Sequence, residues 1–147
     1  MNDKMDNKIQ LIAFCGLYCG ECFAYKGKIA DLSRDLRKEL RQAKFERLAP
    51  NIPFKEFRNY KESYECMGAL VRLRCKKACR GNGGNPFCTI RKCCRKKEII
   101  GCWECDDIEI CKKLDSLKGS HNDAHIKNLR KLKMKGVEEF ISGKKYW

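Results

Sequence analysis

Residues 88–111 read CTIRKCCRKKEIIGCWECDDIEIC, a stretch that carries six cysteines. The spacing is C-x4-C from Cys88 to Cys93, with Cys94 adjacent, and C-x2-C-x5-C through Cys102, Cys105 and Cys111. A two-residue gap lets a tight turn direct both sulfurs at one ion, and tetrahedral zinc takes two such pairs. The stretch therefore predicts an irregular lobe of knuckles and turns held by metal.

The other candidate cysteines precede this stretch. Cys15, Cys19 and Cys22 read C-x3-C-x2-C, and Cys75 and Cys79 read C-x3-C. The candidate metal ligands are Cys15, Cys19, Cys22, Cys75, Cys79, Cys88, Cys93, Cys102, Cys105 and Cys111. Their grouping into sites is left open by the spacing. Cys66 and Cys94 have no partner at a good spacing and are interpreted as packed small side chains.

The composition favours a structural role for the metal. The chain has 147 residues, and its 43% of hydrophobic residues includes the 12 cysteines, so little apolar core remains for this length. A structural zinc contributes roughly 10–16 kcal/mol in small peptides, against a stability of about 5–15 kcal/mol for a whole domain. One zinc site could decide whether the cysteine lobe folds.

The expected compartment is the cytoplasm. No apolar run approaches the roughly 18–20 residues that cross a bilayer, and no secretory signal is recognisable at the start, so no membrane partner is expected. In a reducing compartment, many cysteines indicate metal binding or redox chemistry rather than disulfides.

Two other cysteine chemistries stay open. Four thiolates also suit an iron–sulfur cluster, although no cysteine is followed by proline and no ferredoxin spacing occurs. The segment Cys102-Trp-Glu-Cys105 has the spacing of a dithiol redox pair, but no strand–helix–strand pattern surrounds it. The alternative to structural zinc is therefore an iron–sulfur or dithiol redox protein.

Nucleic acid is a further candidate partner, because 33 basic and 19 acidic residues give a formal net charge of +14. Basic residues gather in three groups: Arg72, Arg74, Lys76, Lys77 and Arg80; Arg91, Lys92, Arg95, Lys96 and Lys97; Lys127, Arg130, Lys131, Lys133 and Lys135. The first two groups alternate with cysteines, as in a zinc-knuckle nucleic-acid-binding protein. They can equally offset the negative charge of metal thiolates. The third group spreads around a helix and reads as a solvated surface.

The rest of the chain predicts helices. Apolar residues at Ile29, Leu32, Leu36, Leu40 and Ala43 form one stripe expected to be buried on a helix over residues 28–48. A second helical stretch carries Phe54, Phe57, Tyr60, Tyr64, Met67 and Val71 and is expected to pack on the first. Short helices are expected over Thr89–Lys97 and Asp106–Leu117, and a last one begins after Asn122 or Asp123 and is weakened or bent at Gly136.

These patterns together predict a mostly α fold. Residues 1–147 form a single domain, with a helical part over residues 26–73 and 122–147 and a cysteine-rich lobe over residues 15–22 and 75–111. No phosphate loop, catalytic triad or paired carboxylates appear, so an enzyme is not favoured. His121 and His125 could share a helix face, but they read as an exposed helix end.

A family resemblance covers nearly the whole chain. Phe14-Cys-Gly-Leu-Tyr-Cys-Gly-Glu-Cys22, Cys88-Thr-Ile-Arg-Lys-Cys93 and Cys102-Trp-Glu-Cys105 with Cys111 resemble the bacterial and archaeal proteins of domain of unknown function family 3795. The segment from Asn128 to Trp147 is similar too. Ala78 stands where the family has a glycine, and Cys66 and Cys94 are additional. The resemblance implies a small cysteine-rich protein that is presumed to bind zinc, with no established activity.

Overall fold

The computed structural model describes residues 7–147, and all of the regular secondary structure in this range is helical. An isolated antiparallel bridge joins Ile12 and Tyr18. The prediction of a mostly α fold is therefore confirmed. No helix in the described range is long and apolar enough to span a bilayer.

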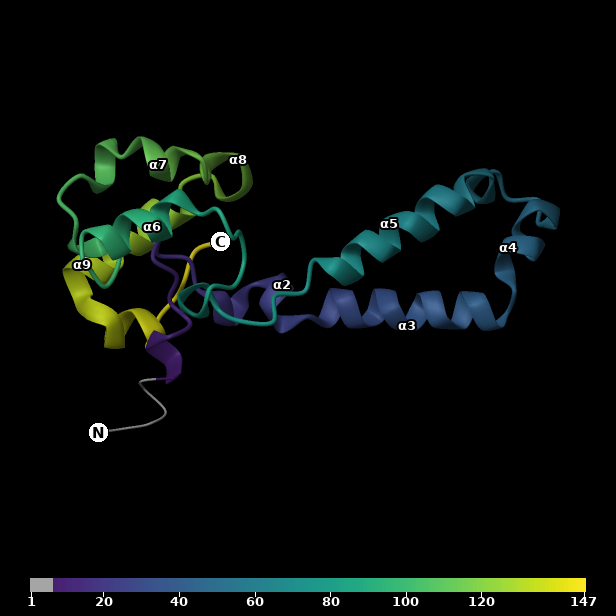
Figure 1. Ribbon diagram of the computed structural model, residues 1–147, viewed down its shortest axis with the longest axis horizontal. Coiled ribbons are helices and arrows are strands. Elements are labelled where there is room, and N and C mark those ends of the chain that lie inside the picture. The colour runs from purple at the N-terminus through teal and green to yellow at the C-terminus, as the bar shows by residue number, and fades with distance from the viewer. Residues whose placement is uncertain (1–6) are drawn as a thin grey trace. The chain divides into compact units, whose positions relative to one another are not determined.

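The chain divides into two compact units. The hairpin unit is Phe23–Cys75, and the cysteine unit combines Lys76–Trp147 with the described residues before Phe23. The hairpin unit contains α2 (Phe23–Lys26), α3 (Lys28–Gln42), α4 (Phe45–Leu48), η2 (Ala49–Asn51), η3 (Lys55–Asn59) and α5 (Tyr60–Arg72), where η marks a 3-10 helix. Its two long helices, α3 and α5, run antiparallel and diverge toward the end where α4 lies (Figure 1).

An arginine lies between α3 and α5. The guanidinium carbon of Arg37, on α3, is 4.4 Å from the centre of the Tyr64 ring on α5. Gly68, one turn further along α5, is buried, and a Cβ atom there would come within 3.0 Å of the same guanidinium carbon. The missing side chain of Gly68 therefore makes room for the Arg37 guanidinium against α5.

The apolar stripe predicted to be buried on α3 is not buried. Ile29, Leu32 and Leu36 are 43%, 60% and 50% exposed. The predicted helix over residues 28–48 is also interrupted, because Lys44 takes a left-handed backbone conformation between α3 and α4. The first aromatic of the second stretch, Phe54, precedes η3 and is exposed. The prediction that the second stretch packs on the first is confirmed, since α5 contacts α3. The contact involves Tyr64, from the second predicted stripe, together with Arg37 and Gly68, which belong to neither stripe.

The cysteine unit consists of several short helices and one long helix, α9, around one core. Its elements are η1 (Cys19–Glu21), η4 (Cys79–Gly81), α6 (Thr89–Lys96), η5 (Cys102–Glu104), η6 (Ile108–Ile110), α7 (Lys112–Asp115), α8 (Lys118–His121) and α9 (Ala124–Ser142). The core contains Ile12, Phe14, Ile90, Cys94, Trp103, Ile108, Leu114, Leu129, Leu132 and Phe140. Five of the candidate ligands pack against it: Cys15, Cys79, Cys88, Cys102 and Cys111.

Several local predictions for this unit can be compared with the structure. The helix expected over Thr89–Lys97 is α6, and Gly136 bends α9 with a φ of 80°. The single helix expected over Asp106–Leu117 is instead two short ones, η6 and α7, because the chain is extended at Cys111 between them.

The two histidines do not share a helix face. His121 ends α8, and Asn122, with a φ of 48°, separates it from α9. The interpretation of both as an exposed helix end is wrong for His125, which is fully buried. His125 lies on the face of α9 that enters the core with Leu129.

Candidate metal centre

Five cysteines line one cavity of about 420 Å³ in the cysteine unit. Cys93 and Cys94 come from α6, and Cys102 and Cys105 come from the knuckle that contains η5. Cys111 directly precedes α7. Four of the five, all but Cys94, are predicted ligands. We call these five side chains the thiol pocket.

Short-range contacts shape the Cys102 knuckle. The Cys105 N–H donates to the Cys102 carbonyl over 3.0 Å, so the two-residue gap forms a single 3-10 turn. The Ile100 N–H donates to Oε2 of Glu104 over 2.8 Å, and this hydrogen bond holds the backbone before the turn against the turn itself. A Cβ atom at Gly101 would come within 2.1 Å of the Trp103 ring, which is buried in the core. Gly101 and Trp103 together fix the direction in which Cys102 enters the pocket.

Two thiols of the pocket are in direct contact. The Sγ atoms of Cys94 and Cys102 lie 3.5 Å apart, and their contact is a hydrogen bond. This hydrogen bond lowers the pKa of Cys94, whose thiolate it stabilises. The same contact, together with burial, raises the pKa of Cys102, which keeps its proton. Within the pair, Cys94 therefore loses its proton more readily than Cys102 does.

Basic side chains surround the pocket. Nζ of Lys97 donates to Sγ of Cys105 over 3.3 Å and lies 3.8 Å from Oδ2 of Asp107. The hydrogen bond to Cys105 and the nearby negative charges raise the pKa of Lys97. Lys112 and Lys113 also line the cavity. These cations can balance part of the negative charge of several thiolates.

A second set of thiols lies elsewhere in the same unit. Cys15 is near Cys79 and Cys88, and burial, followed by these two sulfurs, raises the pKa of the Cys15 thiol to about 12. Sγ of Cys88 accepts a hydrogen bond from the Arg91 N–H over 3.5 Å and so caps the start of α6. A buried thiol with so high a pKa ionises readily only when a cation such as a metal ion binds it.

Two arginines support this second set. Arg91 is buried, and its guanidinium donates to the carbonyls of Cys79, Gly83 and Asn85 over 3.2, 2.8 and 2.7 Å. Nε of Arg80 donates to the Ile12 carbonyl over 2.8 Å, and its guanidinium carbon lies 4.7 Å from the centre of the Phe14 ring. Burial lowers the pKa of Arg80, and the sulfurs of Cys79, Cys94 and Cys19 oppose that shift. Both arginines therefore bring positive charge among the cysteines.

The described residues hold the thiols near one another without a finished coordination sphere. Within residues 7–147, no three Cys, His, Asp or Glu side chains already converge as metal ligands. Cys22 follows η1 in the cysteine unit, and Cys75 ends the hairpin unit, where its N–H donates to the Ala24 carbonyl. Cys66 is exposed on α5, so its interpretation as a packed small side chain is wrong. A metal ion would therefore have to draw the thiols closer together.

Sequence reasoning missed Cys94, which is only 1% exposed and lines the thiol pocket. The prediction that it packs as a small side chain is confirmed, since it belongs to the core. Its neighbour Cys93 already completed a spacing, so Cys94 appeared superfluous. The adjacent pair of cysteines was itself a signal that a helix carries two thiols into one place.

Comparison with known proteins gives one match. The family model described as Protein of unknown function (DUF3795) matches residues 11–116, which is more than half of the chain. The chain belongs to this family. The matched range contains all ten candidate ligands of this DUF3795 protein as well as Cys94. No curated protein and no solved structure matches it.

Proposed function

We propose that this DUF3795 protein binds metal through the thiol pocket, with a zinc ion held by Cys93, Cys102, Cys105 and Cys111. The observation that carries the proposal is that four predicted ligands, separated by up to 18 positions in sequence, line one cavity. Four thiolates on two chain segments are the donor set of structural zinc sites. The proposal includes a cytoplasmic location, because such thiolates persist where the surroundings are reducing.

The dimensions of the pocket fit this donor set. Tetrahedral zinc with sulfur at about 2.3 Å requires sulfur–sulfur separations of about 3.8 Å. The cavity of about 420 Å³ that these four cysteines line leaves space for one ion with its sulfur ligands at such separations. Lys97, donating to Cys105, supplies the kind of outer hydrogen bond that orients a ligand and tunes its basicity. The metal's contribution would be structural, since a closed set of four sulfurs leaves no position for substrate.

A second centre of the same kind is part of the proposal. Cys15, Cys79 and Cys88 would supply three thiolates, with Cys19 as the fourth donor. Arg91 would hold the loop that carries Cys79, through its hydrogen bond to the Cys79 carbonyl. Two centres therefore account for eight of the ten predicted ligands, which leaves Cys22 and Cys75 outside them.

Metal content and visible absorbance of protein purified without oxygen test the proposal. We expect about two zinc ions per chain and no colour. Cobalt exchanged into the same sites should give intense visible bands typical of tetrahedral thiolate coordination. Iron with sulfide and a brown colour would replace the zinc proposal by an iron–sulfur cluster, for which a cavity of about 420 Å³ also leaves space. Protein without metal that keeps its fold would contradict both.

Removal of the metal gives a second readout. A chelator in reducing buffer should expose the amides of α6 and η5 to hydrogen exchange, because a structural zinc contributes on the order of 10 kcal/mol. The amides of α3 should exchange as before, since α3 carries none of the proposed ligands. Cys66→Ser is the matched cysteine control, because Cys66 is exposed on α5 and should leave the metal content unchanged.

A further inference from the structure

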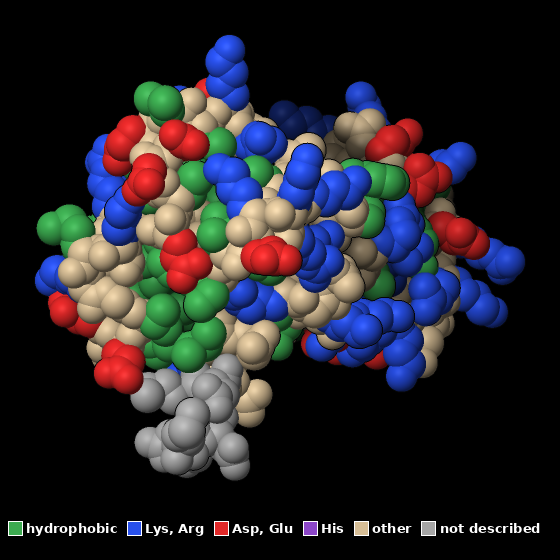
Figure 2. All heavy atoms as spheres, turned by 60° about the vertical axis from the view of Figure 1, so that its left-hand side comes forward, with side chains coloured by type: hydrophobic (Ala, Val, Ile, Leu, Met, Phe, Trp, Pro, Cys, Tyr) green, Lys and Arg blue, Asp and Glu red, His purple; other side chains and the backbone are tan. Residues whose placement is uncertain are grey.

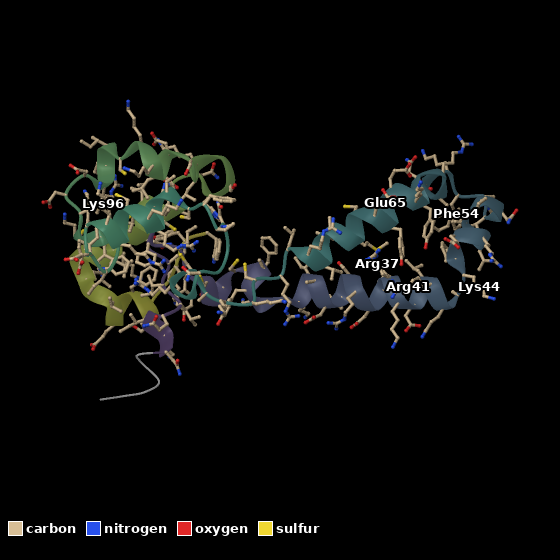
Figure 3. The ribbon with its side chains drawn as sticks, viewed as in Figure 1. Arg37, Arg41, Lys44, Phe54, Glu65 and Lys96 are labelled. Atoms are coloured by element: carbon tan, nitrogen blue, oxygen red, sulfur yellow. The ribbon has the colours of Figure 1, made fainter. Side chains whose placement is uncertain are left out.

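A hollow of about 640 Å³ opens at the end of the hairpin unit, away from any cysteine. Its walls come from the last turn of α3, from α4 and the segment after it, and from the start of α5. Figure 3 shows Arg41 and Lys44 at this end of α3, and Phe54 across from them near the start of α5. A cavity of several hundred cubic ångströms is the size of a binding site for a small organic group.

Aromatic rings form a continuous series along this hollow. The ring centres of Phe54 and Phe57 are 5.9 Å apart, those of Phe57 and Phe45 5.4 Å, those of Phe45 and Tyr60 5.2 Å, and those of Tyr60 and Tyr64 6.0 Å. Four of the five rings are only half-buried and the fifth, that of Phe54, is exposed. The rings stabilise the divergent end of the hairpin and still offer area to a flat ligand.

Unneutralised cations surround the rings. The hollow is lined by five basic side chains and one acidic one, Glu46; the basic ones are Arg41, Lys44, Arg47, Arg58 and Lys61. Across the part of the chain that the structure describes, none of these five takes part in an ion pair. All five are exposed, and Arg41 donates to the Tyr64 hydroxyl over 2.9 Å. The hollow therefore has an excess of positive charge that no acidic side chain of the described residues neutralises, and a bound anion could do so.

The basic group on α9 provides a contrast. Lys127, Arg130, Lys133 and Lys135 each form an ion pair, with Asp123, Glu109, Asp106 and Glu139. The prediction that this group is a solvated surface agrees with these pairs. Arg91, from the second basic group, is buried and cannot contact a polyanion. Free cations combined with accessible rings are found at the hairpin end.

The chemistry of the lining selects the ligand. Accessible rings bind flat bases by stacking, and free cations bind the phosphates that join those bases. The lining contains no Asn, Gln, Ser or Thr side chain that could read one base by hydrogen bonds. We propose that the end of the hairpin unit binds single-stranded nucleic acid with little dependence on sequence. This proposal stands independently of the metal centre.

Fluorescence anisotropy with the full, metal-loaded chain tests the proposal. The probe is a labelled single-stranded oligonucleotide of about ten nucleotides, compared with a duplex of the same length and with a mononucleotide. We expect saturable binding of the single strand that weakens with salt, and several-fold weaker binding of the duplex, because its stacked bases hide their faces. A preference for the duplex, or binding of the mononucleotide alone, would overturn the proposal.

A matched pair of variants separates this site from general attraction to a basic protein. Lys and Arg side chains are spread over much of the face shown in Figure 2, so loss of charge alone would weaken any binding. Arg58→Ala with Lys61→Ala removes two cations of the hollow, and Lys92→Ala with Lys96→Ala removes two exposed cations of α6. Only the double variant of Arg58 and Lys61 should change the salt dependence of binding. The slope of the logarithm of the association constant for the single strand against the logarithm of the salt concentration should become shallower by about 1.4, the value for two lost phosphate contacts. Equal losses in both pairs would overturn the proposal.

Variants of Tyr60 test the stacking. Tyr60→Phe should bind as the natural protein does, whereas Tyr60→Leu should lose about 5- to 150-fold in affinity, the range of one lost base stack. The ring of Tyr60 also packs on Phe45 and Tyr64, so circular dichroism must show that the variant keeps its helices. If Tyr60→Leu unfolds the hairpin, the double variant of the exposed Arg58 and Lys61 still tests the proposal through the salt dependence of binding.

Discussion

Sγ of Cys94 lies 3.5 Å from Sγ of Cys102, although Cys94 has no partner by sequence spacing. The contact brings a core residue of α6 against the first sulfur of the Cys102 knuckle. This hydrogen bond lowers the pKa of Cys94 and raises the pKa of Cys102. In the proposed zinc centre, five thiols would then compete for four tetrahedral positions, with the neighbours Cys93 and Cys94 as the two alternatives for one of them.

Alanine variants of the two neighbours identify the ligand. We expect Cys93→Ala to lose one zinc ion per chain and Cys94→Ala to keep the full metal content, because Cys93 completes the predicted spacing. Cys94→Ala should still lower the free energy of unfolding by about 1 kcal/mol, since it removes a buried sulfur from the core. Metal analysis and urea unfolding measure the two effects. The reverse pattern of metal loss would assign the position to Cys94.

Lys97 should slow the release of metal. Its ammonium donates to Sγ of Cys105 over 3.3 Å and so stabilises the thiolate form of that ligand. Lys97→Gln should accelerate transfer of zinc to a chromogenic chelator by about tenfold, within the range seen for outer hydrogen bonds to metal ligands. Lys97→Arg should be intermediate, because it keeps the charge with a different shape.

The control for this experiment is the residue before it. Lys96→Gln removes the same charge from α6, and no hydrogen bond joins Lys96 to a thiol within the described residues. Zinc should leave the Lys96 variant at the natural rate. Equal acceleration in both variants would mean that Lys97 acts only through the general charge of the protein.

Arg91 should matter for stability rather than for binding of polyanions. Its buried guanidinium donates to three backbone carbonyls of the segment from Cys79 to Asn85. Arg91→Met removes all three of these hydrogen bonds, although the N–H groups of Asn82 and Cys88 still donate to the Cys79 and Asn85 carbonyls. We expect a loss of roughly 2–5 kcal/mol in the free energy of unfolding. Lys92→Met, one residue further and exposed, should change it by less than about 0.5 kcal/mol. Urea unfolding of the metal-loaded protein measures both.

The sequence predicted the local structure well where residues close together in the chain determine the backbone conformation. The cysteine spacings predicted the knuckle at η5, and the apolar and polar pattern predicted α6 nearly to the residue. The segment over residues 81–86 contains two positive φ angles, at Asn82 and Gly84, and both are residue types that adopt this conformation readily. In each case the chemistry that fixes the structure lies within a few neighbouring residues.

The sequence misled where long-range packing decides. Ile29, Leu32 and Leu36 have helical spacing, which fits a buried stripe, but spacing does not say whether a partner helix covers it. Arg37 looks like a surface residue until Gly68, 31 positions later, is found to leave room for its guanidinium. The burial of Arg91 and of His125 is also hidden, because each has the residue type of a surface position while its side chain packs inside the cysteine unit.

The buried His125 predicts a loss of stability on mild acidification. Its ring lies beside the backbone of Leu114, and neither ring nitrogen has hydrogen-bond geometry to a partner within residues 7–147. Burial, followed by the nearby His121, lowers the pKa of His125 below the value of about 6.5 expected in the unfolded chain. Lys118 lowers it further, while Asp123 opposes the shift.

The sign of the effect follows from proton binding. Below a pH of about 6.5 the unfolded chain binds a proton at this histidine and the folded chain does not, so stability falls as the pH falls through that value. His125→Leu should flatten the dependence of the free energy of unfolding on pH between about 5 and 7. Thiolate protonation also destabilises a zinc protein in acid, so the natural protein and the variant must be compared with the same metal content. Identical slopes for both proteins would mean that His125 is protonated equally in the folded and unfolded states.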